Sequence, residues 1–313
     1  MSLKIISLGV INTDIIAFGL DNLPGGGEAS YGGALKIGPG GKSRNMACMM
    51  GKLLGGKVAM IGKTNRDKYG LWKIPMDALK EANVNIDHIK ILDDENKFPS
   101  IALISVDKKG ENAISVCGNV GNSFSTEDID DSQDLFKEVS ENNGLLVMSL
   151  EMPYLTADYA IKKANSFGLK VMVDPGGLKL NQDYSDLFTN DIYLIKPNEQ
   201  ESKLLTGIDV VDFESAKKAA DVLITKGVEN VFITVGAEGG YLFSEGLEVH
   251  IPAPESSCDI KDSTGCGDQT MATLCAFISE GESIEKAAEK AILAGTLQFG
   301  KSGISPLERE DVL

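Results

Sequence analysis

The 313-residue sequence predicts an α/β fold with a doubly wound, mostly parallel sheet that has helices on both faces. Two observations predict it. From Thr126 onward, short apolar runs alternate with longer segments of helical periodicity. Polar or glycine-rich segments follow several of the apolar runs. This pattern is typical of parallel strands whose carboxyl ends lie beside a ligand. The length fits one large domain, which we expect to span residues 1–313.

The elements follow from local patterns. Short apolar runs stopped by glycine or polar residues predict buried strands at 4–9, 57–61, 145–149, 170–174, 191–195 and 230–235. Apolar residues that recur on one side predict helices at 43–54, 67–82, 156–167, 213–226, 267–279 and 284–298. This alternation is typical of parallel sheets, whose ligands bind at the carboxyl ends of the strands.

Two further regions do not follow this alternation of strands and helices. Residues 14–37 contain several glycines between short apolar stretches. Residues 100–107 and 112–118 alternate in polarity around a Lys-Lys-Gly-Glu turn, which predicts a hairpin. We expect both regions, about 14–37 and 98–120, to form one small β-sheet that serves as a lid.

Charge and composition exclude several classes of function. Lys and Arg total 30 and Asp and Glu total 46, which gives a net charge of −16. Such a chain repels phosphate backbones and anionic membranes, so we expect neither nucleic acid nor membrane as a partner. The five cysteines include no Cys-x-x-Cys pair, which argues against disulfides and zinc and fits a reducing cytoplasm. With only two histidines, the work of a general base falls to a carboxylate.

The segment 262–268, Asp-Ser-Thr-Gly-Cys-Gly-Asp, is the sharpest local signal. It precedes an apolar helix, and its glycines let backbone N–H groups approach a ligand closely. The first turn of a helix offers unpaired donors and the positive end of the dipole, which suits a phosphoryl group. A carboxylate at Asp268 could then accept the proton of an attacking hydroxyl. The alternative is a plain loop that has an Asp near a helix start.

A second glycine-rich segment, Gly38 to Asn45, also leads into a helix. Asn45 can donate and accept hydrogen bonds and Lys42 can donate them, a combination that suits a polyhydroxylated ligand. A capped helix start explains the same residues. Asp14 and Glu151 add carboxylates just past two of the expected strands.

Two more segments follow expected strands. In Lys196 to Glu201 the proline favours a helix start, and the Asn and Glu oxygens are ligands that Mg²⁺ prefers. A helix cap is the alternative. Thr234 to Gly240 could cradle a nucleotide or form a tight hairpin turn. All of these segments lie at strand ends or helix starts, so we expect them to meet on one rim of the sheet.

Taken together, the sequence resembles the ribokinase-like (PfkB) family of carbohydrate kinases. The similarity extends from Ile6 to Pro306 and is carried by 40–45, 197–201 and 262–268, in the family's order. The resemblance implies a Rossmann-like α/β domain with a β-sheet lid, and lids that pair in a homodimer. It also implies transfer of the γ-phosphoryl group of ATP to a sugar hydroxyl, with Mg²⁺.

The resemblance further assigns roles to individual positions. Asp268 would be the catalytic base, and Gly265, Cys266 and Gly267 would donate the anion hole. Sugar contacts would come from Asn12, Asp14, Gly40, Gly41, Lys42, Asn45 and Glu151, together with Asp268. ATP would lie along Asn198, Thr234, Gly236, Gly239, Gly265 and Gly267, while Asn198 and Glu201 would hold Mg²⁺ through water.

Members that phosphorylate ribose match the sugar segments best, so ribose is the expected acceptor. Ser43 and Arg44 depart from that pattern and are reminiscent of pseudouridine and other nucleoside kinases. Fructose and 2-keto-3-deoxygluconate remain further alternatives, as does a sensing protein without activity. Asp262 and Thr264 resemble half of a K⁺ site, but Ile304 stands where a serine is expected in the other half.

Overall fold

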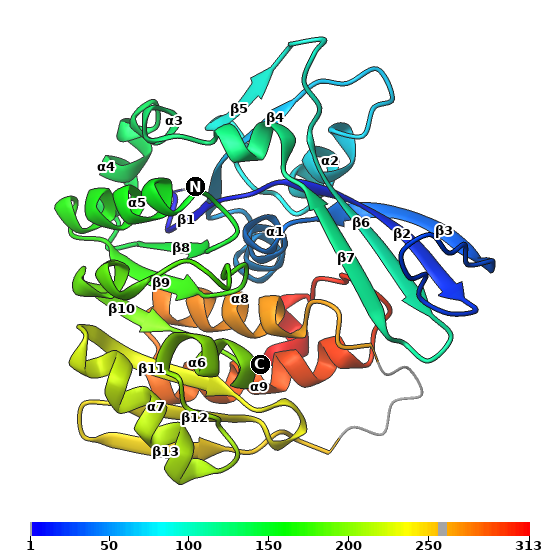
Figure 1. Cartoon of the computed structure of the whole chain (residues 1–313). Coiled ribbons are helices and arrows are strands. Elements are labelled where there is room, and N and C mark those ends of the chain that lie inside the picture. Colours follow the sequence, from blue (N-terminus) through cyan, green and yellow to red (C-terminus); the bar gives the residue numbers. More distant parts are fainter. Residues whose placement is uncertain (1, 256–261) are drawn as a thin grey trace.

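The computed structural model describes residues 2–255 and 262–313 and contains two β-sheets. The larger has nine strands in the order β13-β12-β11-β10-β9-β8-β1-β4-β5 (Figure 1). From β11 to β5 all neighbouring strands are parallel, whereas β12 and β13 extend the edge in antiparallel fashion. The nine strands are β1 (Ile5–Leu8), β4 (Val58–Asn65), β5 (Ile89–Leu92), β8 (Leu145–Ser149), β9 (Lys170–Asp174), β10 (Ile192–Ile195), β11 (Val228–Thr234), β12 (Gly240–Ser244) and β13 (Leu247–Ile251).

Helices cover both faces of this sheet, as the sequence predicted. One face packs against α3 (Thr126–Asp130), α4 (Gln133–Glu141), α5 (Tyr154–Ser166) and α7 (Phe213–Thr225). The other packs against α1 (Lys42–Leu54), α2 (Lys73–Glu81), α8 (Cys266–Ser279) and α9 (Ile284–Phe299). The remaining helix, α6 (Glu199–Thr206), follows β10.

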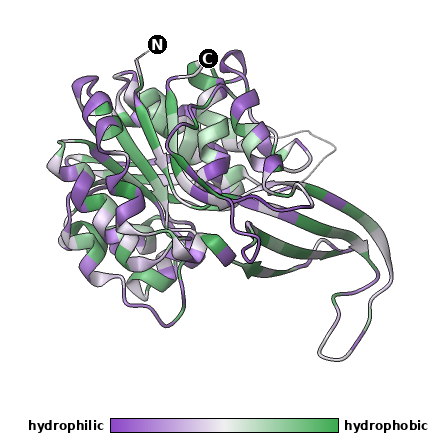
Figure 2. Ribbon diagram, turned by 90° about the horizontal axis from the view of Figure 1, so that it is seen from above, coloured by the Kyte–Doolittle hydropathy of each residue, from purple (hydrophilic) through white to green (hydrophobic). Residues whose placement is uncertain are grey.

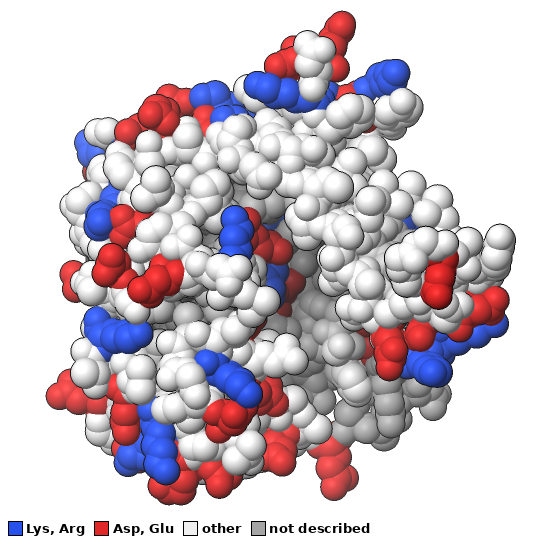
Figure 3. All heavy atoms as spheres, in the orientation of Figure 1, with Lys and Arg blue, Asp and Glu red and all other residues white. Residues whose placement is uncertain are grey.

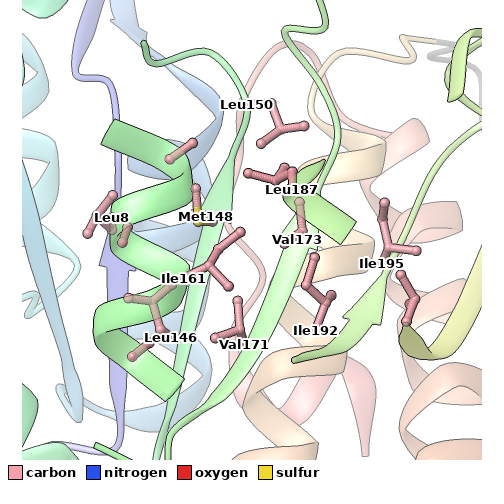
Figure 4. Close-up of a cluster of buried hydrophobic side chains, with 14 of the residues drawn as sticks. Leu8, Leu146, Met148, Leu150, Ile161, Val171, Val173, Leu187, Ile192 and Ile195 are labelled. Carbon is pink, nitrogen blue, oxygen red and sulfur yellow. The ribbon is translucent and has the colours of Figure 1, made fainter. Parts of the chain in front are cut away.

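Side chains that alternate along the strands divide the core into two layers. Leu146 and Met148 of β8 point toward α5, together with Val171 and Val173 of β9 (Figure 4). Their neighbours Leu145 and Val147 belong to the layer on the opposite face. Strands buried on both faces read as continuous apolar runs, which is why the sequence located β8 and β9 at their observed bounds. In Figure 2 these hydrophobic strands lie between helices whose outer sides are hydrophilic.

The predicted fold class is confirmed, with local differences in the elements. The helix expected at 67–82 begins only at Lys73. The carboxylate of Asp67 accepts hydrogen bonds from the N–H groups of Tyr69 (2.8 Å) and Trp72 (2.9 Å), which stabilises a turn in place of the first helical residues. Strand β4 continues to Asn65, past the expected end at 61.

The smaller sheet has the order β3-β2-β6-β7 and projects from the body as an arm (Figures 1 and 2). Its strands are β2 (Asn12–Leu20), β3 (Gly32–Gly40), β6 (Ser100–Asp107) and β7 (Asn112–Cys117). The expected hairpin is β6–β7, and it pairs with the earlier segment because β6 runs parallel to β2. In Figure 3 a hollow separates this small sheet from the body, with acidic and basic side chains in its depth.

Within the described ranges, no helix combines the length and apolar character needed to cross a bilayer.

Candidate active site

Helix α8 begins beneath this hollow, and its first turn carries Asp268. Gly265 is its N-cap with φ of +77°, a left-handed conformation that favours glycine. The Cys266 N–H donates to Ser263 O (3.2 Å) within the turn, and neither the Gly265 nor the Gly267 N–H has an acceptor in 2–255 or 262–313. Together with the helix dipole, these two donors have the chemistry that an anion site requires, and we call this turn the candidate anion site.

Asp268 is 5% exposed and its two carboxylate oxygens face different partners. Lys42 Nζ donates to Oδ1 at 2.9 Å, and Asn45 Nδ2 donates to Oδ2 at 2.7 Å. Both partners come from the first turn of α1, which packs along α8. The two glycine-rich helix starts recognised in the sequence therefore meet at this carboxylate.

Backbone constraints hold the start of α1 in place. Gly41 is its N-cap with φ of +91°, and a Cβ there would lie 2.6 Å from the Val10 carbonyl oxygen. The Lys42 N–H donates to Glu151 Oε2 at 2.8 Å, which ties α1 to the end of β8. Burial raises the pKa of Glu151 to about 7, although Lys42 opposes the shift.

Asn12 and Asp14 of β2 form the neighbouring wall. Asp14 packs against Gly40, where any side chain would overlap its carboxylate. Burial raises the pKa of Asp14 to about 6; Arg44 opposes this rise and Asp268 adds to it. The buried Asn12 Oδ1 has no hydrogen-bond partner among the described residues. These two side chains present oxygens that can accept hydrogen bonds from ligand hydroxyls.

Sequence reasoning missed Asp174 and gave no role to Lys196, the first residue of the segment 196–201; both lie between the two halves of the site. Asp174 is buried and forms ion pairs with Lys42 Nζ (3.4 Å) and Lys196 Nζ (3.1 Å). Burial would raise the pKa of Asp174, but the two ammonium groups hold it below its ordinary value. Lys196 Nζ lies 3.7 Å from the position that a Cβ atom on Gly267 would occupy. Its positive charge is therefore close to the N–H groups at the start of α8. Asp174 could have been found because it ends a buried strand, as Glu151 closely follows one.

A pocket of about 620 Å³ adjoins Asp268. Lys42 links the two, because it lines this pocket and also holds Asp268. The pocket-lining residues that the sequence had singled out are Lys42, Asn198, Glu201, Thr234, Gly236, Gly239, Cys266 and Gly267. The segment after β11 joins antiparallel strands, as the hairpin alternative predicts, and it also lines the pocket, where nucleotide binding stays a prediction.

Asn198 and Glu201 cap α6 reciprocally. Asn198 Oδ1 accepts from the Glu201 N–H (2.8 Å), and Glu201 Oε2 accepts from the Asn198 N–H (2.9 Å). The capping alternative is thus realised, yet both residues also face the pocket. Burial and the negative charge of Asp174 raise the pKa of Glu201.

Asp262 and Thr264 lie at the far end of the α8 loop. The Asp262 carboxylate accepts from the N–H groups of Thr264 (2.9 Å) and Gly303 (2.8 Å). The buried Gln298 donates its Nε2 to the carbonyl oxygens of the same two residues, at 3.2 and 2.6 Å. A side-chain amide therefore joins the two segments that the resemblance had assigned to K⁺.

Comparison with known proteins agrees with this geometry. The model of the pfkB family of carbohydrate kinases matches residues 2–310. The chain belongs to this family. It is accordingly an ATP-dependent carbohydrate kinase, which confirms the resemblance seen in the sequence.

Individual relatives cover most of the chain. A ribokinase from Haemophilus influenzae is 30% identical over 298 residues, which are 95% of this chain and 92% of the relative. A deoxyribokinase from Salmonella typhi is 28% identical over 91% of this chain and 89% of the relative. The structure of Arabidopsis thaliana ribokinase complexed with ribose and ATP superposes with a TM-score of 0.86 at 24% identity, covering 100% of this chain and 98% of that one. This last similarity establishes a shared fold.

Proposed function

We propose that this protein transfers the γ-phosphoryl group of ATP to a hydroxyl group of ribose. The observation that carries the proposal is the position of Asp268. Its carboxylate lies at the N-terminus of a helix, between a wall of hydroxyl-binding side chains and a pocket with nucleotide dimensions. The similarity to ribokinases supports the choice of sugar.

On the acceptor side, the sugar would lie between the start of α1 and β2. Asp14 is suited to hold two adjacent hydroxyls, and the unpartnered Asn12 Oδ1 to hold another. Gly40 and Gly41 let the backbone pack closely against Asp14 and Val10, where a side chain would clash, and Glu151 fixes this backbone through Lys42. Asn45 would contact both the sugar and Asp268.

On the donor side, ATP would occupy the pocket along Asn198, Thr234, Gly236 and Gly239. Asp268 would take the proton of the attacking hydroxyl. The free N–H groups at the start of α8 would stabilise the negative charge that develops on the phosphoryl group, assisted by Lys42 and Lys196. Closure of the small sheet would exclude water and so limit hydrolysis of ATP.

The residues that line the pocket fit Mg²⁺. They include the carboxylates of Glu199, Glu201 and Glu255 and the amide of Asn198, whose oxygens are ligands that Mg²⁺ prefers. Among the described residues no cluster of three potential ligands exists, so Asn198 and Glu201 would hold the ion through water and phosphate oxygens. Bound there, Mg²⁺ would neutralise charge on the phosphates.

The expected K⁺ pattern is incomplete in its second half, where the apolar Ile304 replaces a serine. The carboxylate of Asp262 and the carbonyl of Thr264 accept hydrogen bonds from protein groups. The side chain of Ile304, which is apolar, packs beside Gly265. We therefore assign no monovalent cation to this reaction.

We also propose that two copies pair through the small sheet. Because neighbouring residues of a strand point to opposite faces, the face away from Asp14 carries Ile15 and its cross-strand partners Ile37 and Leu103, with Leu35 two residues along β3. Leu35 is 70% exposed and Leu103 46%, a hydrophobic surface that a second copy would cover.

Light scattering tests this pairing. Leu35→Glu is expected to change a dimer into a monomer of about half the mass, because it buries a charge in the proposed contact. Leu180→Glu serves as the control, since Leu180 is also exposed but lies away from the sheet. A monomeric wild-type protein, or a dimer that survives Leu35→Glu, contradicts the proposal.

We place the reaction in the cytoplasm, where ATP is available as co-substrate. The cysteines of the described ranges are free thiols, as a reducing compartment would keep them. Cys258 lies outside the described residues.

A substrate panel tests the proposed function. Ribose, 2-deoxyribose, fructose, 2-keto-3-deoxygluconate, adenosine, cytidine and pseudouridine are each supplied with ATP and Mg²⁺, and release of ADP is measured. We expect the highest kcat/KM for ribose. A preference for a nucleoside or pseudouridine supports the alternative that Arg44 suggested. No acceptor-dependent release with any of them contradicts the proposal and favours a sensing role.

A further inference from the structure

Arg44 is a buried arginine without an acidic partner. Its side chain is 1% exposed, although arginine is rarely found fully buried. The chain's other two arginines form ion pairs, Arg66 with Asp93 and Arg309 with Glu280. Arg44 has no ion pair with any carboxylate in the described ranges 2–255 and 262–313. A buried guanidinium is costly, so its place beside the acceptor wall requires an explanation.

The guanidinium makes three contacts with neutral groups. Nε donates to the Gly40 carbonyl (3.2 Å), Nη1 to Cys48 Sγ (3.6 Å) and Nη2 to Asn45 Oδ1. Gly40 is the residue against which the Asp14 carboxylate packs. Arg44 therefore joins the end of β3 to the first turns of α1, the two segments assigned to the sugar.

The contacts of Asn45 with Arg44 and with Asp268 together fix which way its amide points. Because arginine only donates hydrogen bonds, the amide oxygen must face Arg44. The amide nitrogen then faces Asp268 and donates to Oδ2 at 2.7 Å. In the reverse orientation the amide oxygen would face the carboxylate and the nitrogen would face a donor. Arg44 thus acts on Asp268 through Asn45.

The charge of Arg44 acts on Asp14. Asp14 is partly desolvated, and Asp268 is a second negative charge nearby. Both disfavour the ionised form that would hold two sugar hydroxyls. Arg44 is the cationic group that opposes them.

We propose that Arg44 is a positioning residue for the acceptor half of the reaction, which orients Asn45 against Asp268 and balances the charge of Asp14. The inference rests on the proposed function, since it concerns the sugar side of that site. It assigns Arg44 no contact with the sugar, because the side chain is enclosed by protein.

Two substitutions separate the two effects. Arg44→Met keeps the length and removes both charge and donors, whereas Arg44→Lys keeps the charge but cannot donate to Gly40 and Asn45 in the same geometry. Kinetics with ribose from pH 5 to 8.5 give kcat and the acid limb of kcat/KM. Arg66→Met is the matched control, because Arg66 is exposed and lies outside the site.

In the wild type, kcat/KM is expected to fall as the pH drops through about 6, because protonation removes the charge of Asp14. In Arg44→Met the acid limb of the kcat/KM profile should move to higher pH by about one unit, because loss of the positive charge stabilises protonated Asp14. Arg44→Lys should keep the limb and lower kcat by about tenfold, because Asn45 is no longer fixed. The KM for ATP should stay unchanged in both.

Crystal structures of the two variants give a readout that needs no substrate. We expect the Asn45 amide to turn away from Asp268 in both. If the wild type phosphorylates no sugar, the proposed function fails, and the orientation of Asn45 still decides the role of Arg44. An unchanged Asn45–Asp268 contact in both variants overturns the inference. The inference also fails if both variants keep the wild-type kcat and the wild-type acid limb of kcat/KM. Should Arg44→Met not fold, Arg44→Gln replaces it for the acid limb because it also removes the charge, and Arg44→Lys still decides the orientation of Asn45.

Discussion

Asp268→Asn is expected to reduce kcat for ribose by roughly 10²- to 10⁴-fold, equivalent to about 3–5 kcal/mol of transition-state stabilisation. The amide has nearly the same shape as the carboxylate but cannot accept the proton of the attacking hydroxyl. The loss should appear in kcat, while the KM for ribose changes little, because in the proposed complex Asp14 and Asn12 would supply most of the sugar contacts.

The fold should tolerate this change. Lys42 keeps Asp174 as an ionic partner when Asp268 becomes neutral, so the free energy of unfolding should shift by less than about 1.5 kcal/mol. Asp77→Asn, on the exposed side of α2, is the control and should keep full activity. Near-normal turnover of Asp268→Asn would assign the base to another residue.

Lys42→Met is expected to lower both activity and stability. Lys42 Nζ contacts Asp268 (2.9 Å) and Asp174 (3.4 Å). Burial lowers the pKa of Lys42, but Asp174, Asp268 and Glu151 together raise it well above its ordinary value. Removing one partner of a fully buried pair typically costs about 3–5 kcal/mol, and the 29% exposure of the Lys42 side chain places its pairs at the lower end. We expect about 3 kcal/mol here, because Lys196 remains on Asp174. Loss of positive charge beside the phosphoryl group should lower kcat about 10²-fold.

Thermal or urea unfolding and steady-state kinetics measure the two effects. The control is Lys52→Met, on the same helix, whose ammonium forms an exposed pair with Glu308. That variant should lose less than about 1 kcal/mol and keep its activity. If Lys42→Met behaves like Lys52→Met, the charge network between the two halves of the site has no functional role.

Local patterns predicted most of this architecture. Strands β8 and β9 are apolar runs with clear ends, and the helix starts at Gly41 and Gly265 are marked by glycines followed by polar residues. Positions close to a strand end or a helix start could therefore be selected from sequence alone. Their convergence on one rim follows from parallel topology and needs no knowledge of contacts.

Contacts between distant residues were beyond this reasoning. The pairing of Asp174 with Lys196 and Lys42 depends on how β9, β10 and α1 come together. The bridge from Gln298 to Thr264 and Gly303 joins segments that no local pattern connects. Burial of Arg44 runs against the usual preference of arginine for the surface, so its role required coordinates.

The most direct test of the central claim is the rate of phosphoryl transfer in a single turnover, measured by rapid quench after ATP is mixed with ribose-saturated enzyme. The account predicts that Asp268→Asn lowers this rate in the same proportion as kcat, while calorimetry gives a ribose dissociation constant within about threefold of the wild type. An unchanged transfer rate, or a loss explained entirely by weaker ribose binding, would contradict a proton-accepting role for Asp268.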